Sequence, residues 1–249
     1  MKASNLLWLF IFIIGIIGCD KEKDDGSRAF SDVATITGDS INGYFCYLNS
    51  GGLAVSHDRW LGSIERGYFS FHYTKDDWTT TSDQISYINN AHVFPISVHQ
   101  VLRPISLEEA ESRHITNPDS CSVPEILSIG RGYQGYFIFN TGLSVVNREN
   151  VEKIPVRMNF VYDPAKQTPD TLRLQFCYQP HIPDDWTKTS FDYDAASCDI
   201  SSLATLIPWS DSVTIVVEAG DEMQHRTKIN KQDFLKPQPF RLSPANKED

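Results

Sequence analysis

Alternation of apolar and polar side chains recurs along this sequence and restricts the folds open to it. Val156, Met158, Phe160 and Tyr162 alternate with the polar residues Arg157, Asn159 and Asp163 over a single segment. Successive side chains of a strand point to opposite faces of a sheet, so this pattern gives one buried and one wet face. Aromatic residues make up 12% of the chain, which also favours strands over helices. We therefore expect an all-β protein.

The first part of the chain consists of short apolar segments separated by turn residues. Val33–Thr37 and Tyr44–Leu48 flank one such turn, and a Gly-Gly turn then leads into Leu53–Ser56. The remaining strands expected in this block are Gly67–Tyr73, Ile85–Asn89 and Val93–Val101. Short strands with turns at this spacing predict a small barrel or sandwich, which we place at residues 30–104.

A second block rich in strands follows at residues 121–236. Its expected strands are Glu125–Ile129, Tyr136–Asn140, Val156–Tyr162, Leu172–Tyr178, Val213–Ala219 and Thr227–Ile229. They predict an antiparallel β-sandwich of about seven strands. Residues 105–120 break the pattern, so we expect a linker there, in which Ser106 caps a short helix. The tail, residues 237–249, contains three prolines and mixed charge, and we expect it to be flexible.

The N-terminus carries an apolar run that reads as an export signal. Leu6–Ile17 is 12 residues long, which is too short for a membrane-spanning helix of about 20 residues but suits a signal peptide. The run ends at Gly18 and Cys19, as in a bacterial lipoprotein cleavage site, although Ile17 replaces the small residue usual there. An ordinary secretory peptide is the less favoured alternative, because a charged stretch follows the cysteine at once. We expect residues 1–18 to be removed and Cys19 to be lipidated.

Lipidation at Cys19 would attach the mature chain to a membrane. Bacterial lipoprotein cysteines carry two or three acyl chains, which anchor firmly where a single chain binds reversibly. Residues 19–29 begin with a charged stretch that cannot bury apolar area, so they are expected to form a flexible tether. An acidic segment just after the cysteine resembles a lipoprotein surface-export signal. We expect an outer-membrane lipoprotein that faces the cell surface or the periplasm.

Charge and motif content exclude several classes of function. The net charge is −10 for the whole chain, and it becomes about −11 without residues 1–18. Nucleic acid is disfavoured as a partner, because phosphate binding needs a basic face. No metal-ligand spacing and no nucleophile-elbow motif occurs in the mature chain, and we expect no metal, no cofactor and no enzymatic activity. A Ser/His/Asp site assembled from distant residues stays open, since such sites are recognised by geometry.

Four cysteines remain after the lipidated one: Cys46, Cys121, Cys177 and Cys198. An even number suits two disulfides in an oxidising envelope. The alternation around Cys177 places its thiol on the polar face of a strand, where a free thiol would be reactive. A disulfide between Cys177 and Cys198 is one expectation, and four reduced cysteines are the other.

The segment Gly130–Gly135 matches the G-x-G-x-x-G pattern of dinucleotide-binding sites. Such a site needs a helix after the glycines, whose N-terminus meets the pyrophosphate. Here the segment is followed by Tyr136–Asn140, which reads as a strand. We therefore interpret the glycines as a hairpin turn.

A seven-residue sequence occurs once in each block with six identical positions. The repeated acidic and aromatic residues are Asp76, Asp77 and Trp78 in the first copy and Asp184, Asp185 and Trp186 in the second. One interpretation is a pair of glycan-binding loops, in which indole rings stack on sugars and carboxylates bond hydroxyls. The other is two similar turns whose polar side chains satisfy backbone groups.

The second copy also lies in an acidic stretch that contains Asp192 and Asp194. Clustered oxygens can bind Ca²⁺, but the spacing lacks the glycine and the distal glutamate of an EF-hand loop. A solvated acidic loop is the favoured interpretation.

The order and spacing of several segments resemble the NigD-like lipoproteins of Bacteroides-type bacteria. The segments that carry the resemblance are Asp32–Ile36, Ile85–Asn90, Ile126–Gly130, Tyr136–Phe139, Phe191–Asp192 and Asp211–Val217. The resemblance implies an N-terminal OB-like barrel, a C-terminal immunoglobulin-like β-sandwich and no established catalytic residues. It also implies a protein or peptide partner, in bacteriocin immunity or as a surface accessory factor. A glycan-binding surface lipoprotein is the alternative function.

Overall fold

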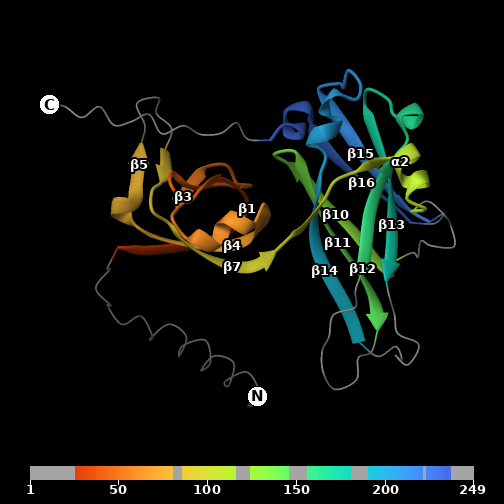
Figure 1. Ribbon diagram of the computed structural model, residues 1–249. Coiled ribbons are helices and arrows are strands. Elements are labelled where there is room, and N and C mark those ends of the chain that lie inside the picture. Colours follow the sequence, from red (N-terminus) through yellow and green to blue (C-terminus); the bar gives the residue numbers. More distant parts are fainter. Residues whose placement is uncertain are drawn as a thin grey trace, which may run out of the picture.

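The computed structural model of the chain describes residues 26–80, 86–115, 124–145, 156–180, 190–220 and 223–236. In these ranges the chain forms two β domains (Figure 1). Each domain encloses its own cluster of buried apolar side chains. The all-β fold expected from the sequence is confirmed.

The N-terminal domain is built on one sheet with the strand order β5-β6-β3-β2-β1-β4-β7. Its strands are β1 (Ser27–Asp39), β2 (Gly43–Leu48), β3 (Leu53–Ser56), β4 (Arg66–Thr74), β5 (Trp78–Thr80), β6 (Ser86–Ile88) and β7 (His92–Val98). The first three strands form an antiparallel meander, β3 pairs in parallel with β6, and β5 pairs with β6 in an antiparallel hairpin. This connectivity is OB-like, with β7 added beside β4 as an edge strand.

The core of this domain follows from alternation along β4. Phe69 and Phe71 are fully buried, while Tyr68 is 38% exposed. The short 3-10 helix η1 (Arg59–Ser63) adds the buried side chain of Leu61 to the same core. A second 3-10 turn, η2 (Lys75–Asp77), separates β4 from β5.

The C-terminal domain packs two open sheets, with the orders β10-β11-β14-β8 and β16-β15-β13-β12-β9, into a sandwich. Its strands are β8 (Gln100–Leu102), β9 (Ile105–Ser106), β10 (Ile126–Tyr133), β11 (Tyr136–Val145), β12 (Val156–Tyr162), β13 (Thr171–Pro180), β14 (Ser190–Asp199), β15 (Ser212–Ala219) and β16 (Met223–Asn230). Phe137 and Phe139 of the first sheet meet Phe160 of the second edge to face, with ring centroids 5.4 and 4.9 Å apart. Such aromatic pairs add to the stability that burial alone provides.

Part of the segment expected to be a linker belongs to the sandwich. Strand β9 pairs in parallel with β12, just as the preceding strand β8 pairs with β14. Strand β8 lies inside residues 30–104, which the sequence assigned to the barrel with a strand over Val93–Val101. The structure ends β7 at Val98 and places Gln100–Leu102 in the sandwich. A strand of two residues such as β9 is too short to show a period in the sequence, so the prediction missed it. Residues 116–120 of the expected linker lie outside the described ranges.

Helix α2 (Leu107–Ser112) forms where the sequence predicted a short helix. The Ser106 hydroxyl caps it by accepting a hydrogen bond from the backbone N–H of Glu109, at 3.2 Å. Ala110 on this helix packs with Val161 and Cys177 on the outer face of the five-stranded sheet. The helix therefore covers a sheet face that the alternation alone would assign to solvent.

Strand β14 was not predicted, and two residues expected in an acidic loop lie on it. Asp192 pairs with Leu143, and Asp194 pairs with Thr141, both in the antiparallel ladder with β11. Aspartate is depleted in strands, and β14 has three aspartates in ten residues. Its low strand propensity is the reason that the sequence did not predict it. The acidic-loop interpretation is wrong for Asp192 and Asp194.

The glycine-rich segment is the turn between β10 and β11, as predicted. Gln134 and Gly135 have φ values of +54° and +83°, which fits the positive φ required at both central residues of a type I′ hairpin. A Cβ atom at Gly132 would collide with the side chain of Ile229. The glycines therefore serve the hairpin and its packing against β16.

Candidate binding site

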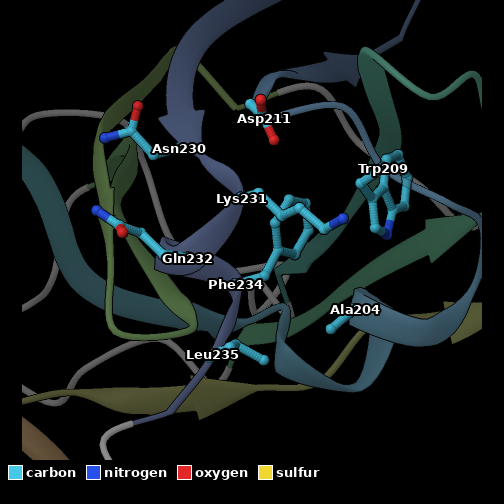
Figure 2. A pocket seen from close by; sticks show the side chains of 8 residues that line it. All are labelled: Ala204, Trp209, Asp211, Asn230, Lys231, Gln232, Phe234 and Leu235. Carbon is cyan, nitrogen blue, oxygen red and sulfur yellow. The ribbon is translucent and has the colours of Figure 1, made fainter.

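An open pocket of about 650 Å³ lies at the end of β16, where the chain enters the 3-10 helix η6 (Lys231–Phe234) (Figure 2). The residues that line it are Ala204, Trp209, Asp211, Asn230, Lys231, Gln232, Phe234 and Leu235. They come from the 3-10 helix η5 (Ser201–Thr205), from the loop before β15 and from η6 with its flanks.

Two stacked aromatic rings form the floor of the pocket. The rings of Trp209 and Phe234 are 5.3 Å apart and 18° from parallel. Both residues are nearly buried, at 4% and 1% exposure, and the Trp209 indole N–H donates to the Leu203 carbonyl at 2.9 Å. Leu235 at the rim is 58% exposed and extends the apolar surface. The floor is therefore rigid and apolar.

The polar rim is held in place by its backbone. A capping box joins Asn230 and Asp233, and the Lys231 N–H donates to the Asp211 carbonyl at 2.9 Å. The N–H of Gly135 donates to the Asp233 carbonyl at 2.5 Å, which ties η6 to the β10–β11 hairpin. The rim thus presents a cation, a carboxylate and two amides around an apolar floor, a combination typical of ligand pockets.

A second concentration of polar groups lies between the two domains. Arg66 of β4 is fully buried, and its guanidinium lies 4.6 Å from the centre of the Tyr136 ring on β11. It donates to the hydroxyl of Thr35 and to the side-chain oxygen of Asn49, the latter at 2.8 Å. Burial lowers the pKa of Arg66 to about 10, so the side chain remains a cation at neutral pH.

Glu65 and Asp199 connect the domains through shared cations. The Tyr136 hydroxyl, Arg103 and Lys236 donate to Glu65 at 2.7, 2.5 and 3.2 Å. Burial alone would raise the pKa of Glu65, but these donors outweigh it and hold the pKa below its usual value. Lys236 also lies 2.8 Å from the Asp199 carboxylate. Glu65, Asp199, Arg103 and Lys236 each lie beside a group of opposite charge, so we assign the cluster a structural role in fixing the domains together.

The β10–β11 turn adds a direct contact between the domains. The Gln134 side chain accepts from the Thr35 hydroxyl and donates to the Leu48 carbonyl, both at 3.2 Å. The segment that resembles a dinucleotide-binding motif therefore docks the sandwich onto the barrel.

A Ser–His pair occurs at the same interface. His99 Nδ1 lies 2.8 Å from the Ser197 hydroxyl, and the two residues are only 7% and 0% exposed. Burial, with the positive charge of Arg66, lowers the pKa of His99 to about 4. A nucleophile and its base need access to a substrate, and neither residue lines the pocket. The pair therefore acts as a buried structural hydrogen bond.

The residues predicted from the repeated sequence differ in their surroundings. Asp77 accepts hydrogen bonds from the backbone N–H and the hydroxyl of Thr74, at 2.7 and 2.8 Å. Its carboxylate therefore provides the acceptor for polar groups at the start of η2. Trp78 is 54% exposed. Four further predicted positions lie outside the described residues: Cys19, Asp184, Asp185 and Trp186.

The predicted disulfide is not formed. Cys198 lies in the core between the two sheets, whereas Cys177 faces the opposite side of its sheet, toward α2. The prediction failed because it placed Cys177 on an open polar face, while α2 buries it completely. Across the part of the chain that is described, no three potential metal ligands come together.

The pocket was not anticipated from the sequence. Its floor joins Trp209 to Phe234, which lie 25 positions apart and show no shared motif. The capping pair Asn230 and Asp233 is the local signal that marks the start of η6.

Comparisons with known proteins show a shared fold. No family model matches the sequence, and no curated protein matches it. The solved structure of a candidate lipoprotein from Bacteroides fragilis is 10% identical, with a TM-score of 0.53 over 82% of this chain and 98% of that one. An uncharacterized protein from Parabacteroides merdae is 9% identical, with a TM-score of 0.50 over 81% and 99%. A candidate toxin-related protein from Parabacteroides distasonis is 18% identical, with a TM-score of 0.48 over 83% and 96%.

The first two likenesses extend over almost the full length of the solved proteins. They show that the fold of this chain also occurs in Bacteroides and Parabacteroides proteins. In the described ranges, no helix is both long and apolar enough to cross a membrane.

Proposed function

We propose that the protein is a lipid-anchored envelope lipoprotein that binds a peptide segment of a partner protein and catalyses no reaction. Cys19 provides the anchor, and the pocket beside η6 binds the partner. The observation that carries the proposal is the pocket itself, in which a rigid apolar floor is bordered by polar groups of both charges.

The state of the aromatic floor favours a peptide over a sugar. Stacking on a sugar ring needs an exposed aromatic face, but Trp209 and Phe234 stack on each other and are nearly buried. An apolar side chain of a peptide fits such a floor beside Leu235. Lys231 and Asp211 then lie where the polar groups of a peptide backbone would pass.

The placement of the titratable groups supports a non-enzymatic role. His99, Arg66 and Glu65, whose pKa values are shifted, lie at the domain interface. None of the three lines the pocket. Active sites usually gather such groups in a cleft.

The likeness in fold to a candidate lipoprotein of Bacteroides fragilis supports membership of the NigD-like lipoproteins. On this proposal the protein is held in the outer membrane, facing the surface or the periplasm. The partner is then a bacteriocin, in an immunity role, or a surface protein that it assists.

Site-specific crosslinking tests the pocket. A photoreactive amino acid at Gln232 in the lipidated protein should crosslink to one partner segment, identified by mass spectrometry. The same amino acid at Ile41, which is 88% exposed in the β1–β2 turn, is the matched control. Equal crosslinking at both positions would count against a specific site.

The captured segment then provides a binding assay. A synthetic peptide of that sequence should lose about 1 kcal/mol or more of binding free energy with Leu235→Ser or Lys231→Glu, as hot-spot residues do. Calorimetry measures the loss. Unchanged affinity in both variants would remove the pocket from the proposal.

Glycan binding is the alternative, and the 54% exposure of Trp78 favours it. A glycan array with wild-type protein and Trp78→Ala separates the two functions. Binding that disappears with Trp78→Ala would establish the glycan function.

A further inference from the structure

The edge strand β7 carries an exposed row of apolar side chains. Phe94 and Ile96 are each 53% exposed, and Tyr68 on the neighbouring strand β4 is 38% exposed. We call these three residues the tether face. Large apolar side chains gathered at one edge of a sheet are unusual on a soluble surface and indicate a contact that covers them.

The two strands of the tether face are almost free of charge. The chain as a whole is 22% charged, yet the 16 residues of β4 and β7 contain only Arg66 among the Asp, Glu, Lys and Arg side chains. Arg66 is fully buried. Neither strand therefore carries a carboxylate that an anionic bilayer surface would repel, and the Asp58 carboxylate beside β7 accepts from the Val93 N–H at 2.8 Å.

The tether face lies close to the point where the chain leaves the expected anchor. Phe94 pairs with Ser70, and Ser70 pairs with Ser31. Two strand spacings separate Phe94 from Ser31, about 10 Å. Ser31 lies four residues from the start of β1 at Ser27. Eight residue steps join Ser27 to Cys19, and they reach at most about 28 Å. A lipid on Cys19 would therefore keep this end of the barrel within about 28 Å of the bilayer.

The edge of β7 is poorly suited to a protein strand. Pro95 in the middle of β7 has no N–H to donate, and the pairing with β4 shifts register beside it. Proline and bulges are features that prevent the addition of another strand at a sheet edge. The row of apolar side chains is thus left for a surface that needs no backbone pairing.

We propose that the tether face rests on the bilayer that holds the lipid of Cys19, with Phe94 and Ile96 at the boundary between head groups and acyl chains. The inference depends on the proposed anchor. The lipid and the tether face are then two attachments of the same domain, and they orient the sandwich away from the membrane surface. Apolar and aromatic side chains at this depth are typical of proteins that lie on a bilayer.

Tryptophan quenching in vesicles tests the contact. Lipidated Phe94→Trp protein is reconstituted into vesicles of phosphatidylethanolamine and phosphatidylglycerol with brominated acyl chains. The added emission, relative to the unsubstituted protein, should be quenched. Ile41→Trp is the matched control, since Ile41 follows the far end of β1, about 40 Å from Ser27 and beyond the reach of the tether. Its added emission should stay unquenched.

Further arms separate the ways in which the inference can fail. Adding Ile96→Ser and Tyr68→Ser to Phe94→Trp should abolish the quenching. Protein that lacks acyl chains by mass and does not float with vesicles would overturn the anchor. Protein that floats but shows no quenching at position 94 would overturn the tether face alone. A dimer of Cys19→Ser protein that Ile96→Ser dissociates would assign the face to a second copy and would also overturn the proposal.

Discussion

Helix α2 covers the outer face of the five-stranded sheet in the sandwich, whereas the barrel leaves the tether face on β4 and β7 uncovered. Val161 under the helix is 2% exposed, while Ile96 on β7 is 53% exposed. β-branched apolar residues therefore lie on outer sheet surfaces with opposite degrees of burial. The difference shows that alternation along a strand identifies two faces but does not determine which of them meets solvent.

The largest expected effect comes from placing a charge on each of these surfaces. Val161→Asp would bury an unpaired carboxylate beneath α2 and should lower the free energy of unfolding by about 4 kcal/mol. Ile96→Asp should change it by less than about 0.5 kcal/mol, since that side chain stays in water. Urea unfolding of the soluble Cys19→Ser protein measures both. Equal losses in the two variants would contradict the comparison of covered and uncovered faces.

The domain interface is a third kind of surface, since it buries ions as well as apolar groups. Arg66→Ala would leave Thr35 and Asn49 without their donor and remove the cation from the Tyr136 ring. Breaking a buried charged cluster in this way should cost about 3 kcal/mol.

An exposed ion pair provides the control for Arg66. Arg113 pairs with Glu109 on the surface of α2, and Arg113→Ala should cost no more than about 0.5 kcal/mol. Both losses are read from urea unfolding. A loss of similar size in the two variants would show that burial does not strengthen the interface cluster.

The interface should also make stability depend on pH in a way that the apolar faces do not. His99 is neutral in the folded protein, because burial and Arg66 lower its pKa to about 4. In the unfolded chain its pKa is about 6.5. The stabilisation is therefore complete above pH 6.5 and is lost as the pH falls toward 4. We expect a loss of about 3 kcal/mol across this window. Glu65, whose pKa is lowered, adds a further loss below about pH 4.5.

Urea unfolding at pH 7 and pH 4 measures this dependence. His99→Gln can still bond to Ser197 without taking up a proton, so it should reduce the loss between the two pH values. His72→Gln on the exposed side of β4 should leave the loss unchanged. An unaltered pH dependence in His99→Gln would assign it to other groups.

Strands and turns that depend on local chemistry were accessible from the sequence. The hairpin at Gly135 needs positive φ, and the cap of α2 needs the Ser106 hydroxyl. Alternation also marked β12 with the bounds that the structure shows, Val156–Tyr162.

Features that depend on distant residues were not accessible. The burial of Cys177 requires Ala110 from a helix some 65 positions away in the chain. The same holds for the interface, where Glu65 meets Lys236, and for the floor of the pocket. No periodicity within one segment reports such contacts, because each partner alone has an ordinary sequence environment.

The smallest of these effects concerns the cap that holds α2 over its sheet. Ser106→Ala removes the acceptor for the Glu109 N–H and should cost about 1 kcal/mol, while Ser106→Asp, which keeps an acceptor, should cost little. Fraying of the first turn of α2 would expose the Cys177 thiol beneath the helix. Alkylation of Cys177 should therefore be faster in Ser106→Ala than in Ser106→Asp, as followed by mass spectrometry. Equal alkylation rates would mean that the packing of Ala110 holds the helix without its cap, and the covered face would then owe its burial to apolar contacts alone.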